Sequence, residues 1–176
     1  NAESSIAVVS KVISSSNDED EITDKLTAYQ DGKKIEILAE SEGILVKGND
    51  KKTLEAGDII QYVTNTEGEI TNIRVLFDIA TKNTEAEVQA AENLKTVYGK
   101  VTKKFANSVN VSINGGEVKN YELSSDVAVY SVDTKISKNN VSAAVLGDIQ
   151  AYDEDEGNRL FLKIYKDVVQ EVVIIK

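Results

Sequence analysis

The side chains of this sequence that could do chemistry are almost all carboxylates. The chain has 30 Asp and Glu residues against 20 Lys and Arg residues, and it has no His and no Cys. The absence of both excludes Ser-His-Asp and Cys-His nucleophiles and the ordinary zinc sites. Glycoside hydrolysis needs only two carboxylates and is compatible with these residue types. However, the chain has no Trp and only 6% aromatic residues to line a sugar-binding cleft. We therefore expect no enzyme, with a carboxylate-based glycosidase as the less favoured alternative.

Two acidic runs suggest calcium as a ligand. Residues 18–21 read DEDE, and residues 153–158 read DEDEGN. Calcium takes about six to eight oxygen ligands from a loop of defined spacing. Asp153 and Asp155 are the candidate ligands, but Gly157 comes one position early for an EF-hand and the distal Glu is missing. Solvated turns explain both runs better. We expect no cofactor, with calcium at Asp153 and Asp155 as the weaker alternative.

The charge balance limits the partners. The formal net charge is -10 and the pI is about 4.6. A duplex binder needs a basic stripe that releases phosphate counterions, so we expect no nucleic acid and no anionic membrane surface. No apolar run approaches the roughly 20 residues of a membrane-spanning helix, so we expect no membrane insertion. Because the chain begins at Asn1 and has no Met, we also expect a processed or excised fragment.

An internal repeat organises the elements that carry these side chains. Residues 8–12 (VVSKV) correspond to residues 97–101 (VYGKV), and residues 54–59 (LEAGDI) correspond to residues 144–149 (AVLGDI). Both pairs are separated by an offset of about 90 residues, which is typical of a duplicated unit. The Gly-Asp pair inside the second anchor is interpreted as a turn, in which Gly takes positive φ and Asp caps the backbone.

Turn residues and alternating apolar residues predict β-structure in both halves. Asp31-Gly32 and residues 114–116 (NGG) each lie between alternating segments, which is a strong hairpin signal. Residues 149–152 (IQAY) are predicted to be a strand, and residues 159–165 (RLFLKIY) to be part of an extra hairpin of the second copy. About six short strands per copy favour a small barrel or sandwich.

Residues 84–94 (TEAEVQAAENL) break this pattern. They contain a capping box and an apolar face at helical spacing, which predict one short α-helix. The predicted fold class is therefore all-β, with two tandem small β-barrel or sandwich domains of about six strands each, joined by a short α-helix. The predicted boundaries are a first domain at 1–80, a helical linker at 81–95, and a second domain at 96–176.

The order of these motifs resembles repeats in surface-layer proteins. The motifs of the second half are VYGKV at 97–101, NGG at 114–116, VAVY at 127–130, LGDI at 146–149 and VQEVVIIK at 169–176. The family consists of large clostridial and bacillar cell-surface proteins that carry S-layer homology anchoring repeats elsewhere in the chain. The resemblance implies a tandem β-repeat region outside those repeats, extracellular, on the cell wall of a Gram-positive bacterium. It carries over no functional residue.

These observations predict a non-catalytic structural or interaction module of a bacterial cell-surface protein. Its expected partners are other domains of the same surface protein, the cell wall or another protein. The alternative is a ligand-binding or adhesive module for a glycan, a cell-wall component or a protein partner.

Overall fold

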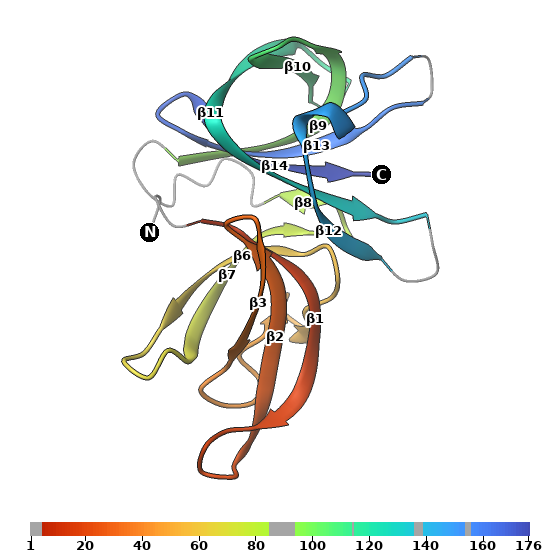
Figure 1. Ribbon diagram of the computed structural model, residues 1–176. Coiled ribbons are helices and arrows are strands. Elements are labelled where there is room, and N and C mark those ends of the chain that lie inside the picture. The colour runs from red at the N-terminus through yellow and green to blue at the C-terminus, as the bar shows by residue number, and fades with distance from the viewer. Residues whose placement is uncertain (1–4, 85–93, 114, 136–138, 154–155) are drawn as a thin grey trace. The chain divides into compact units, whose positions relative to one another are not determined.

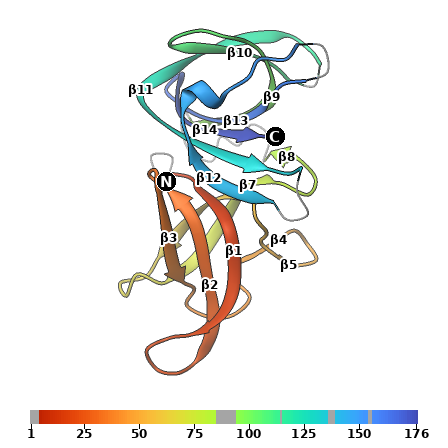
Figure 2. The same ribbon diagram turned by 45° about the vertical axis from the view of Figure 1, so that its right-hand side comes forward.

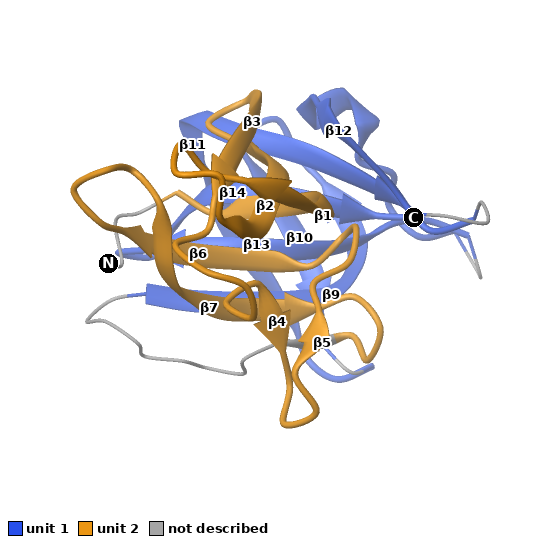
Figure 3. Cartoon of the chain, turned by 90° about the horizontal axis from the view of Figure 1, so that it is seen from below, with its two compact units in different colours: residues 1–4, 84–176 blue, residues 5–83 orange. Residues whose placement is uncertain are grey.

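The computed structural model describes residues 5–84, 94–113, 115–135, 139–153 and 156–176. The chain divides into two compact units. The N-terminal unit is residues 5–83, which are unit 2 in Figure 3, and the C-terminal unit is residues 84–176 together with residues 1–4, which are unit 1. Each unit has a hydrophobic core of its own.

Five main strands make up the N-terminal unit, and Figures 1 and 2 show them from two sides. They are β1 (Ala7–Ser16), β2 (Ile22–Gln30), β3 (Lys33–Leu38), β6 (Ile59–Thr64) and β7 (Ile70–Asp78). The connection between β3 and β6 contains a short hairpin of β4 (Val46–Lys47) and β5 (Lys52–Thr53), and β8 (Asn83–Thr84) follows β7.

Alternating apolar residues explain why these segments form strands around one core. Ala7 and Val9 in β1 are separated by one residue, as are Leu26 and Ala28 in β2, and all four are fully buried in the same cluster. In a strand, residues two apart point to the same face. The inner faces of the strands therefore line a common core.

The Asp31-Gly32 turn joins β2 to β3 as predicted. Gln30 pairs with Lys33, which leaves a two-residue loop. Asp31 has a φ of 52° and Gly32 a φ of 77°, and positive φ at both central residues defines the type I′ hairpin turn. The hairpin prediction is confirmed here.

The N-terminal sheet curves until the end of β3 meets β7 at one point. Its strand order is β3-β2-β1-β6-β7-β8. Ala39, directly after β3, forms a parallel bridge with Ile70, the first residue of β7. The N–H of Glu40 donates to the carbonyl of Ile70 at 2.8 Å. The barrel is therefore partly open, because among the described residues β3 itself pairs with β2 alone.

The C-terminal unit closes completely. Its strand order is β10-β9-β13-β14-β11-β12, and β10 also pairs with β11, which closes five of these strands into a barrel. Parallel pairing of β11 with β14 extends over seven residue pairs. The elements are β9 (Leu94–Lys104), β10 (Ser108–Ser112), β11 (Val118–Asp133), β12 (Asn140–Ala144), the 3₁₀ turn η1 (Leu146–Asp148), β13 (Arg159–Tyr165) and β14 (Val168–Ile175).

Both units have the same connectivity. The first strand pairs with the second and the fourth, and the third meets the fifth in parallel. The five strands are β1, β2, β3, β6 and β7 in one unit and β9, β10, β11, β13 and β14 in the other. This arrangement is the five-stranded Greek-key barrel of the OB-fold.

The predicted fold class is wrong in its joining helix, because within the described residues the structure contains no α-helix. Each unit has a six-stranded sheet, as predicted, and five of the six strands form the barrel. Thr84 and Leu94, the ends of the predicted helix, lie in β8 and β9, while residues 85–93 lie outside the described residues. Leu94 is 1% exposed and pairs with Tyr165 of β13. Cross-strand pairing therefore overrides the helical spacing at this end.

Two predictions for the second copy also need correction. Residues 149–152 do not form a strand. Residues 159–165 are β13, which pairs with β9 and β14 as β6 pairs with β1 and β7, so this segment is the fourth barrel strand and not an extra hairpin. The added length lies in the segment before β13. In the NGG turn, Asn114 lies outside the described residues, and Ser112 pairs with Val118 across the loop.

Candidate interaction site

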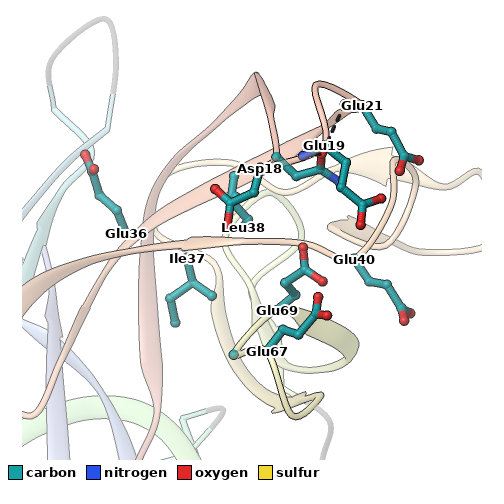
Figure 4. Close-up of a pocket in the computed structure, with 11 residues that line it drawn as sticks. Asp18, Glu19, Glu21, Glu36, Ile37, Leu38, Glu40, Glu67 and Glu69 are labelled. Atoms are coloured by element: carbon teal, nitrogen blue, oxygen red, sulfur yellow. Dashed lines mark hydrogen bonds between the residues drawn. The ribbon is translucent and has the colours of Figure 1, made fainter.

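A pocket of about 660 Å³ lies on the N-terminal barrel. It is formed by the β1–β2 loop (residues 17–21), the β6–β7 loop (residues 65–69) and the end of β3 (Figure 4). Ile37 and Leu38 supply its apolar part. None of its lining residues is Lys, Arg or aromatic, and seven are carboxylates: Asp18, Glu19, Glu21, Glu36, Glu40, Glu67 and Glu69.

The two loops present their carboxylates by the same backbone structure. In the β1–β2 loop, Asn17 Oδ1 accepts hydrogen bonds from the backbone N–H groups of Glu19 at 2.9 Å and Glu21 at 3.0 Å. Between these two, Asp20 takes a φ of 60°. The Asn side chain thus holds the loop, as in other Asx turns.

The β6–β7 loop repeats this geometry. Asn65 Oδ1 accepts hydrogen bonds from the N–H groups of Glu67 at 2.9 Å and Glu69 at 3.0 Å, and Gly68 takes a φ of 82°. A local pattern encodes both loops, because residues 17–21 read NDEDE and residues 65–69 read NTEGE. An Asn followed by Glu at the second and fourth positions is the signal that could have identified both loops. This pattern is not among the features predicted from the sequence above.

The carboxylates of the pocket interact with one another. A hydrogen bond with Glu19, together with its negative charge, raises the pKa of the Glu21 carboxyl. Glu69 raises the pKa of Glu67 in the same way, and charge from Glu19 and Asp18 in the other loop adds to it. Since both glutamates are exposed, their raised pKa comes mainly from the hydrogen bonds and the negative charge of the neighbouring carboxyl groups and less from burial. The pocket therefore favours a cation or a proton.

The position of the pocket matches the part of an OB barrel that binds ligands. OB-folds bind through the face of strands two and three and the loops that join strands one to two and four to five. These are β2, β3 and the two Asn-held loops of this unit. The acidic run at residues 18–21 lies in an exposed loop, as predicted.

The two loops of the pocket differ in charge from their counterparts in the C-terminal barrel. Both units are acidic overall, with 15 Asp and Glu against 9 Lys and Arg in residues 5–83 and 15 against 11 in residues 1–4 and 84–176. In the C-terminal barrel the corresponding loops are residues 105–107 (FAN) and Lys166-Asp167. The acidic site is therefore particular to the N-terminal barrel.

A second charged cluster in the N-terminal unit is buried and structural. Lys47 Nζ contacts Asp58 at 2.8 Å, Asp78 at 2.8 Å and Glu55 at 3.0 Å. Asp58 is fully buried, and its carboxylate also accepts hydrogen bonds from the backbone N–H groups of Glu55 and Ile79. The cluster ties β4 to the start of β6 and the end of β7.

The charges of this cluster follow from burial and hydrogen bonding. Burial lowers the pKa of Lys47, but hydrogen bonds to its three carboxylates outweigh burial and raise it. Burial raises the pKa of Asp58, and the hydrogen bonds that it accepts offset this only in part. Burial also acts to raise the pKa of Asp78, but the Lys47 hydrogen bond leaves it lowered.

The predicted Gly-Asp turns are present, with one difference. Gly57 has a φ of 100°, and Asp58 Oδ2 accepts the N–H of Glu55 at 2.8 Å. In the second copy Asp148 Oδ2 accepts the N–H of Val145 at 3.0 Å, but Gly147 lies in η1 and is not in the positive-φ region. The caps are therefore shared, whereas the glycine conformation is not.

The calcium candidates are not brought together with the acidic pocket. Asp153 forms a β-bridge with Glu156, and the backbone N–H of Asp153 donates to the carbonyl of Glu156 at 2.8 Å. Asp155 lies outside the described residues. Among the residues that the structure describes, no group of three or more acidic side chains is arranged to hold a metal ion. No helix in this part of the chain is long and apolar enough to cross a membrane.

The chain was compared with protein families, curated proteins and solved structures. No protein-family model matches the chain. No curated protein matches it either. Among solved structures, the tetrameric p202 HIN2 is similar over 97% of this chain and 86% of its own, with 13% sequence identity and a TM-score of 0.27.

Proposed function

We propose that this chain is a non-catalytic interaction module, and that the acidic pocket of its N-terminal barrel binds a basic segment of a protein partner. The observation that carries the proposal is the lining of the pocket: seven carboxylates from three elements, with no Lys or Arg among them. Complementary charge gives such sites specificity and a fast association rate.

The pocket favours a protein partner over the other classes of ligand. Sugars usually stack on aromatic rings, and the pocket lining has none. Phosphate backbones would meet repulsion from the carboxylates. A catalytic carboxylic acid is usually desolvated, whereas Glu21 and Glu67 are exposed.

The cellular setting that we propose is the surface of a Gram-positive bacterium. This part of the proposal rests on the resemblance of the repeat motifs to those of surface-layer proteins. The acidic pocket would then bind another domain of the same surface protein or a second protein on the cell wall.

A charge-neutralising variant tests the binding site. The probe is a fluorescent, end-capped heptapeptide that alternates lysine with valine, and its binding is measured by anisotropy. The triple variant Glu19→Gln, Glu67→Gln and Glu69→Gln removes three pocket charges but leaves the backbone donors to Asn17 and Asn65 in place. We expect it to weaken binding by about tenfold or more, which corresponds to ~1.4 kcal/mol.

A matched control separates the pocket from the overall charge. Glu117, Glu122 and Glu156 are exposed carboxylates of the C-terminal unit, and changing all three to Gln removes the same net charge. This control should bind the peptide as the native protein does. Equal losses in both variants would show that overall charge, and not the pocket, attracts the peptide.

A further inference from the structure

We propose that the basic segment binds in an extended conformation, as an additional β-strand along the free edge of β3. The inference rests on the proposed function and adds to it the conformation of the partner and the backbone groups that bind it. Strand addition to an exposed sheet edge is a recurring way to recognise peptides, in which main-chain hydrogen bonds give affinity and side chains give specificity.

The edge of β3 opposite β2 is available. Along Lys33–Leu38, β3 pairs within the described residues with β2 alone. The fifth strand of the barrel, β7, meets the chain only after β3 ends, at the Ala39–Ile70 bridge. An exposed edge of this kind is a ready template for another strand.

The register identifies the backbone groups on that edge. The N–H of Ala39 donates to the carbonyl of Asp24 in β2 at 2.8 Å. Because backbone groups alternate along a strand, the N–H and C=O groups of Ile37 and Ile35 also face β2. The backbone groups of Glu36 and Lys34 therefore face away from β2, toward the free edge.

The side chains near this edge favour a segment that alternates apolar and basic residues. Ile35 and Ile37 pack against the barrel core but are only partly buried. Glu36 lies on the opposite face, exposed, 3.7 Å from Lys25 of β2. An added strand would place apolar side chains beside the two isoleucines and basic ones beside the carboxylates of the pocket, since residues two apart share a face.

Charge complementarity identifies the occupant as a basic segment of another protein and not a second copy of this chain. Pairing two β3 edges would bring two acidic pockets together, each lined by seven carboxylates. Like charges placed against each other at an interface destabilise it by roughly several kcal/mol. A lysine-bearing strand meets the pocket carboxylates with opposite charge, and like charge faces it only at Lys33 and Lys34, at the start of β3.

N-methylation of the probe peptide tests strand addition directly. In an alternating lysine-valine peptide bound as a strand, the N–H groups of one residue type face β3 and those of the other face solvent. We expect methylation of one set of nitrogens to weaken binding by about tenfold or more, and methylation of the other set to change it by less than about threefold.

The protein side is tested with two variants at one position. Glu36→Pro removes the free-edge N–H without breaking a bond to β2, and proline is accepted in edge strands when its nitrogen faces outward. Glu36→Gln removes the charge but keeps the N–H. We expect Glu36→Pro to abolish peptide binding and Glu36→Gln to weaken it by only about threefold, with both variants checked by thermal unfolding.

The outcomes separate this inference from the proposed function. If both methylated peptides bind alike and still depend on the pocket carboxylates, strand addition is wrong while the acidic pocket remains the binding site. If the unmodified peptide does not bind at all, the proposed function fails. Concentration-dependent dimerisation that Glu36→Pro abolishes would contradict the choice of occupant, because it would assign the edge to a second copy.

Discussion

At the scale of the residue, Lys47 should contribute strongly to the stability of the N-terminal unit. Its side chain is 4% exposed, and it compensates Asp58, which is fully buried. Removing one partner of a buried ion pair leaves the other charge without compensation. We expect Lys47→Met to lower the free energy of unfolding by about 3–5 kcal/mol, measured by urea denaturation.

Lys25 provides the control for this prediction. It also contacts a carboxylate, Glu36, but at 3.7 Å, and the two side chains are 27% and 57% exposed. Surface ion pairs contribute about 0–1 kcal/mol, so Lys25→Met should have little effect. A similar small loss in both variants would contradict a structural role for the buried cluster.

At the scale of the element, Gly99 allows β9 to follow the tight curvature of the C-terminal barrel. A Cβ atom at this position would lie 2.4 Å from the carbonyl oxygen of Ser112 and 2.7 Å from Val111 Cγ1. Both neighbours belong to β10, which pairs with β9. A glycine in a strand often marks such a close approach of two backbones.

We expect Gly99→Ala to destabilise the protein by about 1–3 kcal/mol, because overpacking forces the backbone to move. Thermal unfolding measures the change. Gly147→Ala is the matched control, since its Cβ would meet only Val145 Cγ2 at an ordinary 4.0 Å. If Gly99→Ala unfolds at the same temperature as this control, β9 and β10 can separate without cost.

At the scale of the whole molecule, the acidic pocket makes peptide binding depend on pH. Neighbouring carboxylates hold the pKa of Glu21 and Glu67 above the ordinary 4.5, so in the folded protein these groups take up protons more readily. Protonation as the pH falls therefore relieves the repulsion between these carboxylates. It also removes negative charge from the pocket and so weakens the attraction for a cation. We expect affinity for the lysine-valine peptide to decrease as the pH falls from 7, beginning above pH 4.5.

The position of the acidic pocket predicts where the peptide binds. Chemical-shift changes on titration should fall on residues 17–21, 65–69 and β3, and not on the corresponding loops of the C-terminal barrel. Added salt should weaken the interaction, since exposed charges are screened. Constant affinity between pH 7 and pH 4, with the fold intact by circular dichroism, would contradict an electrostatic site.

Local patterns determined the parts of the fold that depend on a few consecutive residues. The Asp31-Gly32 turn could be predicted because positive φ at two positions selects those residue types. The two Asn-held loops are encoded as locally, in residues 17–21 and 65–69, although their pattern was not recognised. The acidity of these loops was also visible in the sequence.

Only the tertiary structure decided what those local pieces form together. The two loops are far apart in the chain and become one pocket because β1, β2, β6 and β7 pair in a curved sheet. Lys47 reaches Asp78 across 31 residues. At Leu94, pairing with β13 outweighed helical spacing. Long-range strand pairing is set by burial and by closure of the barrel, which no short window of sequence contains.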